Sequence, residues 1–305
     1  MLDASKHITF DASKGLTVMV PTLNDEEGDF MRLFMIYEQV MNTTSSQVMF
    51  QFTHCGFLRP NAVAFIGGTI RSLQRKNIIV FVNWSTVSNA VMATLRQNTF
   101  CSKLGYGPAV NLGHAIPYRE DPKEDANSIL DYLTQNWIGK GWVRVSELLR
   151  DAIAGKVWEI YANSFEHSQS EIGVFSCGQH FKRRNELVLS VVDFGVGIPY
   201  NVRQYLSSDS RAASLTAESC LKWACISGNT TARADGIARG LGLHLLKELV
   251  RVNNGKLELY SHDGYVKIDG NGEQFKTLPF YFKGTILNIT LLCDEKYYQF
   301  TSEVG

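Results

Sequence analysis

The chain has 305 residues, a length that predicts about two domains. Its 30 lysines and arginines balance its 30 aspartates and glutamates, so the formal net charge is zero. General nucleic-acid binding depends on basic residues that neutralise phosphates, and this balance gives no sign of it. Apolar residues make up 45% of the chain and charged residues 20%, which is typical of globular rather than disordered proteins.

Nothing in the sequence predicts contact with a membrane. No run of about 18 apolar residues is present, and the mixed polar residues 1–10 lack the apolar core of a signal peptide. The six cysteines form no CxxC pair, and no cluster of Cys and His provides four zinc ligands. Free thiols fit a reducing compartment, so we expect a cytoplasmic protein.

The first third of the chain alternates between strand-like and helix-like segments. Apolar residues at helical spacing mark the helices, and short β-branched or apolar runs mark the strands. In chain order we expect a strand at 16–20, a helix at 30–41, a strand at 48–52, a helix at 61–73, a strand at 78–82 and a helix at 90–95. This alternation predicts an α/β domain, residues 1–110, with helices packed on a mixed or parallel sheet.

Residues 111–127 are predicted to be a linker, because prolines and a charged cluster interrupt the pattern there. The second domain, 128–305, is expected to be α/β (α+β) as well. Its predicted helices are 128–138, 143–167 and 215–226, and its predicted strands are 172–177, 187–193, 256–261, 265–269 and 285–293. Residues 201–240 are rich in small and polar residues, which predicts a mobile lid.

Three common nucleotide and hydrolase motifs are missing. No GxxxxGK[ST] motif is present, so the chain is not a P-loop protein. Gly195-x-Gly197 lacks the third glycine of the dinucleotide fingerprint. No GxSxG motif is present either, which argues against a nucleophile-elbow hydrolase.

A predicted helix carries the first motif that could support chemistry. Glu159, Asn163 and Glu166 are spaced i, i+4, i+7 and share one face. Oxygen ligands of this kind suit Mg²⁺, which binds few protein groups alongside substrate phosphates. A solvated polar stripe is the ordinary alternative.

The second motif follows a predicted buried strand, where Asp193 precedes Gly195 and Gly197. Glycines let a ligand approach the backbone, and the carboxylate can accept hydrogen bonds from an amine. An ordinary Asp-Gly turn is the alternative.

The third and fourth motifs lie further along the chain. Gly240-Leu241-Gly242 runs into an amphipathic helix, whose N-terminus offers free N–H groups to a phosphate. Gly284-Thr285 opens the last apolar strand and places a hydroxyl there. Each of these has an ordinary structural explanation when it is taken alone.

The order and spacing of the four motifs resemble the GHKL superfamily of gyrase, heat-shock chaperone, histidine kinase and mismatch-repair ATPases. The resemblance covers about residues 145–293, or half of the chain. It implies a Bergerat-type α/β sandwich that holds Mg-ATP between helices and a lid.

That resemblance also implies roles for individual residues. Asn163 would hold Mg²⁺, and Glu159 would be the general base that orients the attacking water or hydroxyl. Asp193 would accept from the adenine amine, while Gly195 and Gly197 would let the base approach.

Four further residues would surround the phosphates: Arg239, Gly240, Leu241 and Gly242. Gly240 and Gly242 would wrap them with Leu241 packing behind, and mobile Arg239 could reach the γ-phosphate. Thr285 would support the contact between Asp193 and the base.

The helix motif leaves two activities open. The spacing Glu159, Asn163, His167 is similar to that of the anti-sigma-factor serine kinases, while related ATPases share the Glu and the Asn. A histidine kinase is not expected, because His262-Asp263 is the only His followed by an acid and it lies inside the ATPase half.

The first domain resembles the STAS, or anti-anti-sigma, fold. The strand and turn at 48–61, the strand at 78–82 and the segment 101–106 carry this likeness. In phosphoregulated members the turn holds a phosphoacceptor serine, but here it reads Leu58-Arg-Pro-Asn-Ala62 without a hydroxyl. A fixed docking module for a protein partner is therefore expected.

The sequence as a whole predicts a Mg-dependent ATP-binding protein. A slow ATPase whose lid closure switches the binding of a protein partner is the first hypothesis. A serine/threonine kinase of the anti-sigma type and a nucleotide-sensing scaffold without turnover are the alternatives. An ATP-dependent homodimer is compatible with all three.

Overall fold

The computed structural model describes residues 9–110, 113–226 and 243–303. The chain divides into two compact units, one formed by residues 1–59 and 69–94 and the other by 60–68 and 95–305. Helix α2 (Pro60–Arg75) therefore contributes to both units. Both units mix helices with sheets, so the expected α/β class is confirmed.

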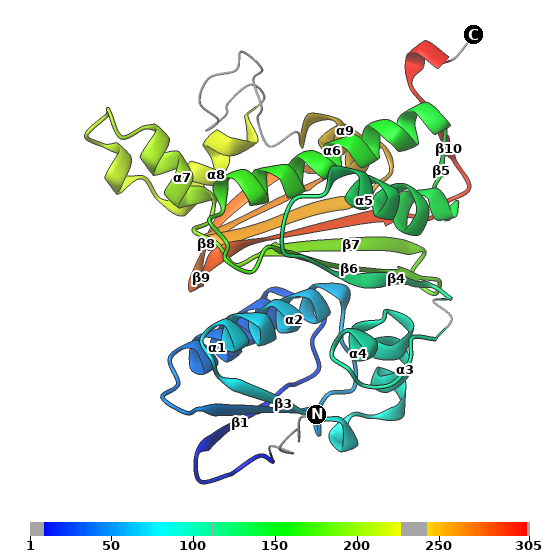
Figure 1. Ribbon diagram of the computed structural model, residues 1–305. Coiled ribbons are helices and arrows are strands. Elements are labelled where there is room, and N and C mark those ends of the chain that lie inside the picture. Colours follow the sequence, from blue (N-terminus) through cyan, green and yellow to red (C-terminus); the bar gives the residue numbers. More distant parts are fainter. Residues whose placement is uncertain (1–8, 111–112, 227–242, 304–305) are drawn as a thin grey trace. The chain divides into compact units, whose positions relative to one another are not determined.

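The first unit contains a small sheet whose strands all run parallel in the order β1-β2-β3. The strands are β1 (Gly15–Met19), β2 (Gln47–Gln51) and β3 (Ile79–Asn83). Parallel neighbours need a crossover between them, which α1 (Glu27–Met41) and α2 provide on one face of the sheet (Figure 1). In β2 the alternate residues Val48 and Phe50 are buried, and in β1 Val18 is buried.

The second unit is built on an antiparallel sheet with the strand order β4-β6-β7-β9-β8. Its strands are β4 (Ala115–Asp121), β6 (Val174–Phe181), β7 (Glu186–Asp193), β8 (Lys256–Asp269) and β9 (Gly272–Leu292). Two further strands of two residues each, β5 (Arg144–Val145) and β10 (Tyr297–Tyr298), pair with each other in parallel and form a separate sheet.

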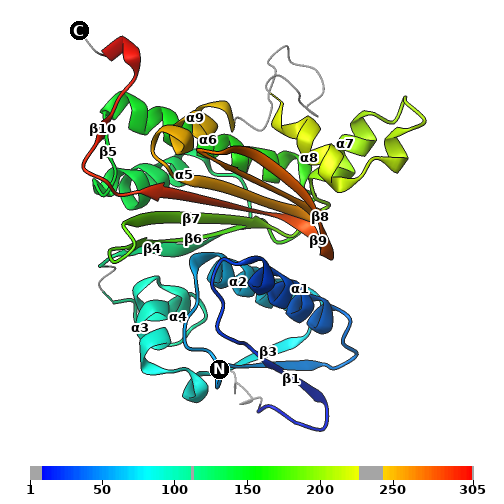
Figure 2. The ribbon, with the colours of Figure 1, turned by 180° about the vertical axis from the view of Figure 1, so that it is seen from behind.

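Helices cover one face of this sheet. Helix α3 (Asn89–Gln97) begins in the first unit and ends in the second, and α4 (Phe100–Lys103) follows it. The later helices of the second unit are α5 (Ala126–Asp131), α6 (Glu147–His167), α7 (Ile198–Tyr205), α8 (Ala217–Cys225) and α9 (Leu243–Val252). Figure 1 shows α5, α6 and α9 above the sheet. In Figure 2, as in Figure 1, α7 and α8 lie at the end where β8 and β9 bend.

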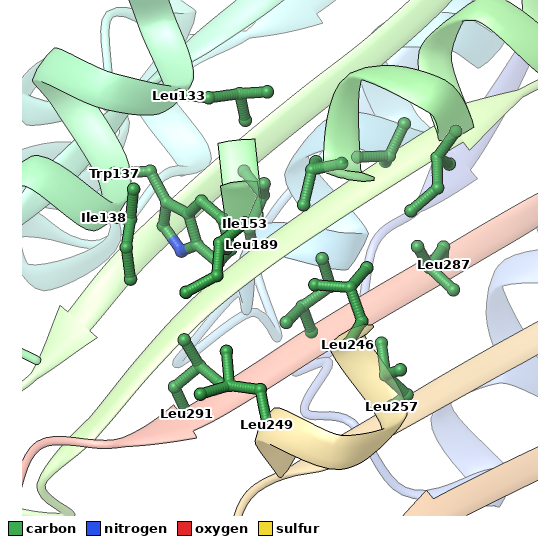
Figure 3. Packing of buried hydrophobic residues seen from close by; sticks show 14 of the residues in the cluster. Leu133, Trp137, Ile138, Ile153, Leu189, Leu246, Leu249, Leu257, Leu287 and Leu291 are labelled. Carbon is green, nitrogen blue, oxygen red and sulfur yellow. The ribbon is translucent and has the colours of Figure 1, made fainter. Parts of the chain in front are cut away.

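The core of the second unit lies between these helices and the sheet. Leu189, Leu257 and Leu287 point up from three neighbouring strands toward Ile153 of α6 and Leu246 of α9 (Figure 3). Alternate strand residues enter this core because side chains alternate between the two faces of a sheet. Burial of these apolar side chains therefore fixes which face of α6 turns inward and which remains for a site.

Ser146 starts α6. Its hydroxyl accepts a hydrogen bond from the Leu149 N–H at 3.1 Å, as an N-cap does, and donates to Glu303 at 2.7 Å. The predicted helix at 143–167 thus begins four residues later than expected. The predicted helix at 128–138 is α5 followed by a π-helical turn, Tyr132–Trp137.

Two other expectations need correction. Residues 115–121 of the predicted linker 111–127 form β4, because Ile116 and Tyr118 are buried while the strand pairs with β6. The strands predicted at 256–261 and 265–269 are one strand, β8, which bends at an irregularity near His262. In the predicted lid, residues 201–226 include most of α7 and all of α8, and residues 227–240 lie outside the described residues.

Of the helices within the described ranges, none has the length and apolar character needed to cross a membrane. All six cysteines are free thiols, and five of them are buried.

Candidate functional site

Asp193 is the last residue of central strand β7 and is only 4% exposed. Its Oδ1 accepts a hydrogen bond from the Gly195 N–H at 3.0 Å, and its Oδ2 accepts one from the Ser164 hydroxyl at 3.4 Å. Thr285 of β9 lies directly opposite in the strand register and adds hydrogen bonds from its hydroxyl and N–H. The structure thus brings together three predicted residues from separate segments.

Burial dominates the chemistry of this carboxyl group. It raises the pKa of Asp193 to about 6, although the hydrogen bonds from Gly195, Ser164 and Thr285 favour the charged form and lower it. A buried carboxylate that is kept charged at neutral pH is a strong hydrogen-bond acceptor. It can therefore accept from an amine that reaches this end of β7.

The two glycines of the Asp193 motif are required by packing. A Cβ at Gly195 would lie 1.9 Å from the Ser168 carbonyl oxygen, at the end of α6. Gly197 has a φ of +78°, and a Cβ there would lie 2.4 Å from the Lys283 carbonyl oxygen. These contacts explain both glycines without a ligand, so the glycines by themselves do not identify a nucleotide site.

The bend in β8 holds the same loop from the other side. The Ser261 hydroxyl accepts from the Ile198 N–H at 3.0 Å and donates to the Gly284 carbonyl at 2.9 Å. His262 Nε2 lies 2.8 Å from the Val196 carbonyl oxygen, which requires Nε2 to be the donor. The loop after Asp193 is therefore fixed at both ends.

Helix α6 presents two different faces at neighbouring residues. Successive residues of an α-helix point about 100° apart, and Ser164 turns toward Asp193 while Asn163 lines an outer groove. Glu159 lines the same groove one turn earlier, and its Oε1 lies 2.5 Å from Lys156 Nζ. Within the described residues, the Asn163 amide makes no hydrogen bond to another side chain.

The groove along α6 has a volume of about 680 Å³. Eight residues of α6 between positions 152 and 166 line it, together with Glu124 and Ala126. Its charged residues are Glu124, Lys156, Glu159 and Glu166, so negative charge predominates. Such a surface repels a bare phosphate and suits one that is accompanied by a divalent cation.

The groove offers one protein ligand that suits a magnesium ion. In the described ranges, no group of three His, Cys, Asp or Glu is placed to hold a metal. Mg²⁺ commonly takes one or two protein ligands and completes its shell with water and substrate phosphates. The amide oxygen of Asn163, half-buried on the groove wall, is suitable for that role.

The structure groups the predicted site residues into two sets. Asp193, Gly195, Gly197 and Thr285 form one connected set, while Glu159 and Asn163 line the groove, which Asp193 does not line. Arg239, Gly240, Leu241 and Gly242 lie outside the described residues.

Sequence reasoning missed the residues that connect these parts. Ser164 joins α6 to Asp193, and Ser261 joins the bend of β8 to the loop after Asp193. A single serine carries no pattern of its own. The one available signal was the position of Ser164, directly after Asn163 in the helix motif.

Comparisons with known proteins do not identify the chain: no family model matches it, and no curated protein gives a significant match.

Proposed function

We propose that this chain is a Mg-dependent ATP-binding protein that hydrolyses ATP slowly and uses the bound nucleotide to regulate a protein partner. The observation that carries the proposal is the buried Asp193 at the end of β7, joined to Thr285 and to Ser164 beside Asn163. Four short motifs in the order of the GHKL superfamily add support. The STAS-like part would be the docking module for the partner.

Each residue has a defined task in this proposal. Asp193 would accept from the adenine amine, and Thr285 would hold the carboxylate in place. Asn163 would hold Mg²⁺, which neutralises phosphate charge when it is bound. Glu159 would take a proton from the attacking water, so that ATP and water give ADP and inorganic phosphate.

The ion pair between Lys156 and Glu159 is compatible with a base role. Both side chains are more than one-third exposed, and exposed i, i+3 pairs contribute about 0.5 kcal/mol or less. The carboxylate can therefore leave the lysine at little cost. A tight pairing would favour the second candidate, a nucleotide sensor without turnover.

The test is ATP binding and turnover on matched variants. Asp193→Asn keeps the shape of the side chain but adds an N–H donor, and we expect ATP affinity to fall more than tenfold. Glu159→Gln should retain binding and lose release of phosphate. Lys14→Gln, a change at an exposed lysine outside both sets of site residues, should retain both.

The outcomes separate the hypotheses. If Asp193→Asn and Asn163→Ala bind Mg-ATP as tightly as the wild type, the proposed site is wrong. Label from γ-labelled ATP on a protein would indicate the serine/threonine kinase alternative, and binding without turnover would indicate the sensor.

A further inference from the structure

Two histidines face each other at the far edge of the five-stranded sheet. His114 directly precedes β4, and His180 lies in β6. The His180 N–H donates to the His114 carbonyl at 2.8 Å, which fixes the two backbones side by side. The two imidazole Nδ1 atoms lie 3.0 Å apart. Neither histidine belongs to the proposed nucleotide site.

Trp142 completes the cluster. Its ring stacks on His180, with the ring centroids 4.6 Å apart and an interplanar angle of 23°. The His114 ring centroid lies 5.9 Å from that of Trp142. His180 is buried under this cover, whereas His114 is exposed. One imidazole is therefore held rigidly while the other is open to solvent and can turn.

The short contact between the two Nδ1 atoms is a hydrogen bond that needs one proton, on one of the two rings. One Nδ1 must donate and the other must accept, because two N–H groups cannot point at each other at 3.0 Å. Two neutral imidazoles can turn two Nδ1 lone pairs toward one cation if the shared proton is displaced.

We propose that His114 and His180 form a binding site for a divalent transition-metal ion of the nickel and copper class. With metal–nitrogen bonds of about 2.0–2.1 Å, nitrogens 3.0 Å apart subtend roughly 90–100° at the metal. That angle is the cis angle of square-planar or tetragonal Ni²⁺ and Cu²⁺, whereas tetrahedral Zn²⁺ needs a wider separation. Mg²⁺ prefers oxygen ligands and is not expected to bind here.

The charges and the number of possible ligands near His114 and His180 limit how tightly an ion can bind. The positive charge of Lys182 acts on His180 and opposes a bound cation. The described residues supply no group of three His, Cys, Asp or Glu for a metal. Two imidazoles would thus be the protein ligands of the ion, and water would fill the remaining positions. We expect a dissociation constant in the micromolar range rather than the tighter binding of a four-ligand site.

The experiment is a titration of the full chain with Ni²⁺ at pH 7.5, without nucleotide, followed by calorimetry and by tryptophan fluorescence. Ni²⁺ is preferred to Cu²⁺ as the probe because it does not oxidise the free thiols. We expect one equivalent to bind and to quench Trp142. His114→Gln should weaken binding at least tenfold, and since His114 is exposed, this variant should fold normally. Trp142→Phe should bind Ni²⁺ with the fluorescence change lost.

His244→Gln is the matched control. His244 is exposed on α9 and also has a side-chain neighbour, Glu248 at 3.7 Å, so its loss should leave Ni²⁺ affinity unchanged. If His114→Gln and His180→Gln both bind as tightly as the wild type, or if His244→Gln abolishes binding, the assignment is overturned. This result does not depend on ATP binding, so its failure would leave the proposed function untouched.

Discussion

At the scale of single residues, the atoms around a position explain its residue type better than its place in a motif does. Gly195 and Gly197 belong to a motif in which glycine is expected to admit a ligand, yet protein atoms already occupy the space at both. Asp193 is different, because its hydrogen bonds to Gly195, Ser164 and Thr285 do not offset its burial. Burial still raises the pKa of this carboxyl group to about 6, and this uncompensated cost is what makes Asp193 informative.

Gly195→Ala is expected to destabilise the protein strongly, by about 2–4 kcal/mol, because the new methyl group meets the Ser168 carbonyl and the backbone must shift. Gly155→Ala is the control, since a Cβ there meets nothing within 4 Å in the middle of α6. That change should stabilise by about 0.5–1 kcal/mol through helix propensity. Urea unfolding of both variants measures the difference, and equal effects would refute the packing argument.

Asp193 should also leave a signature in the pH dependence of stability. Its folded pKa of about 6 lies above the unfolded value of about 3.9, so the folded state holds the proton more tightly between these values. The contribution of Asp193 to stability is therefore largest below pH 4 and falls as the pH rises to 6.

Asp193→Asn cannot titrate, so its stability relative to the wild type should rise between pH 4 and pH 7. The expected change is on the order of 3 kcal/mol. Urea unfolding at several pH values gives this difference directly. Parallel stability curves for the two proteins would show that burial does not shift this carboxyl group.

At the scale of elements, α9 is tied to its neighbours by one buried cation. Lys247 is 11% exposed at its side chain, and its Nζ donates to the Cys225 carbonyl at 2.6 Å and to Glu273 at 3.0 Å. It thereby joins α9 to the end of α8 and to the start of β9. Arg251, one turn later, bonds the same Glu273 carboxylate at 3.1 Å, but its side chain is 42% exposed.

This contrast gives a prediction for two similar variants. Lys247→Met should destabilise by about 1–3 kcal/mol, because the Cys225 carbonyl is left without this donor in a buried place. Arg251→Met removes an exposed contact with the same carboxylate and should cost less than about 1 kcal/mol. Thermal unfolding distinguishes them, and a larger loss for Arg251→Met would contradict the account.

Burial also explains which helices and strands could be predicted from the sequence. Helix α6 and strand β7 were predicted because their apolar periodicity is continuous. Strand β4 was missed because Pro117 and the charges of Arg119–Asp121 conceal it at the sheet edge, where alternate residues face away from the core. The continuity of β8 through its bend depends on His262 with a φ of 58°, a conformation that no local signal predicts.

At the scale of the whole molecule, the family resemblance, rather than local sequence, implied which distant segments meet. Asp193 and Thr285 lie 92 positions apart in the numbering and are strand partners, and the resemblance to the GHKL superfamily is what pointed to this pair. The contribution of Ser164 could not be predicted, because it depends on the rotation of α6, which the core residues such as Ile153 and Val157 determine. Tertiary packing, rather than local sequence, completes the site.

Asp193 lies in β7, Thr285 in the neighbouring strand β9, and Ser164 in α6, which packs on the same sheet. A ligand bound at Asp193 should therefore stabilise the second unit as a whole. A nucleotide that binds only the folded state stabilises it by about 2.7 kcal/mol at 100 times its dissociation constant. For a unit of this size that corresponds to a rise in Tm of roughly 5–10 °C.

Mg-ATP should therefore raise the Tm of the wild type by this amount, and ATP with a chelator should raise it less. Asp193→Asn should show no ligand-dependent rise, whereas Lys14→Gln, at an exposed lysine outside the proposed site, should respond like the wild type. A calorimetric scan with and without Mg-ATP makes the comparison. An equal rise in Asp193→Asn would place nucleotide binding elsewhere on the chain, and no rise in the wild type at millimolar Mg-ATP would contradict the proposed function itself.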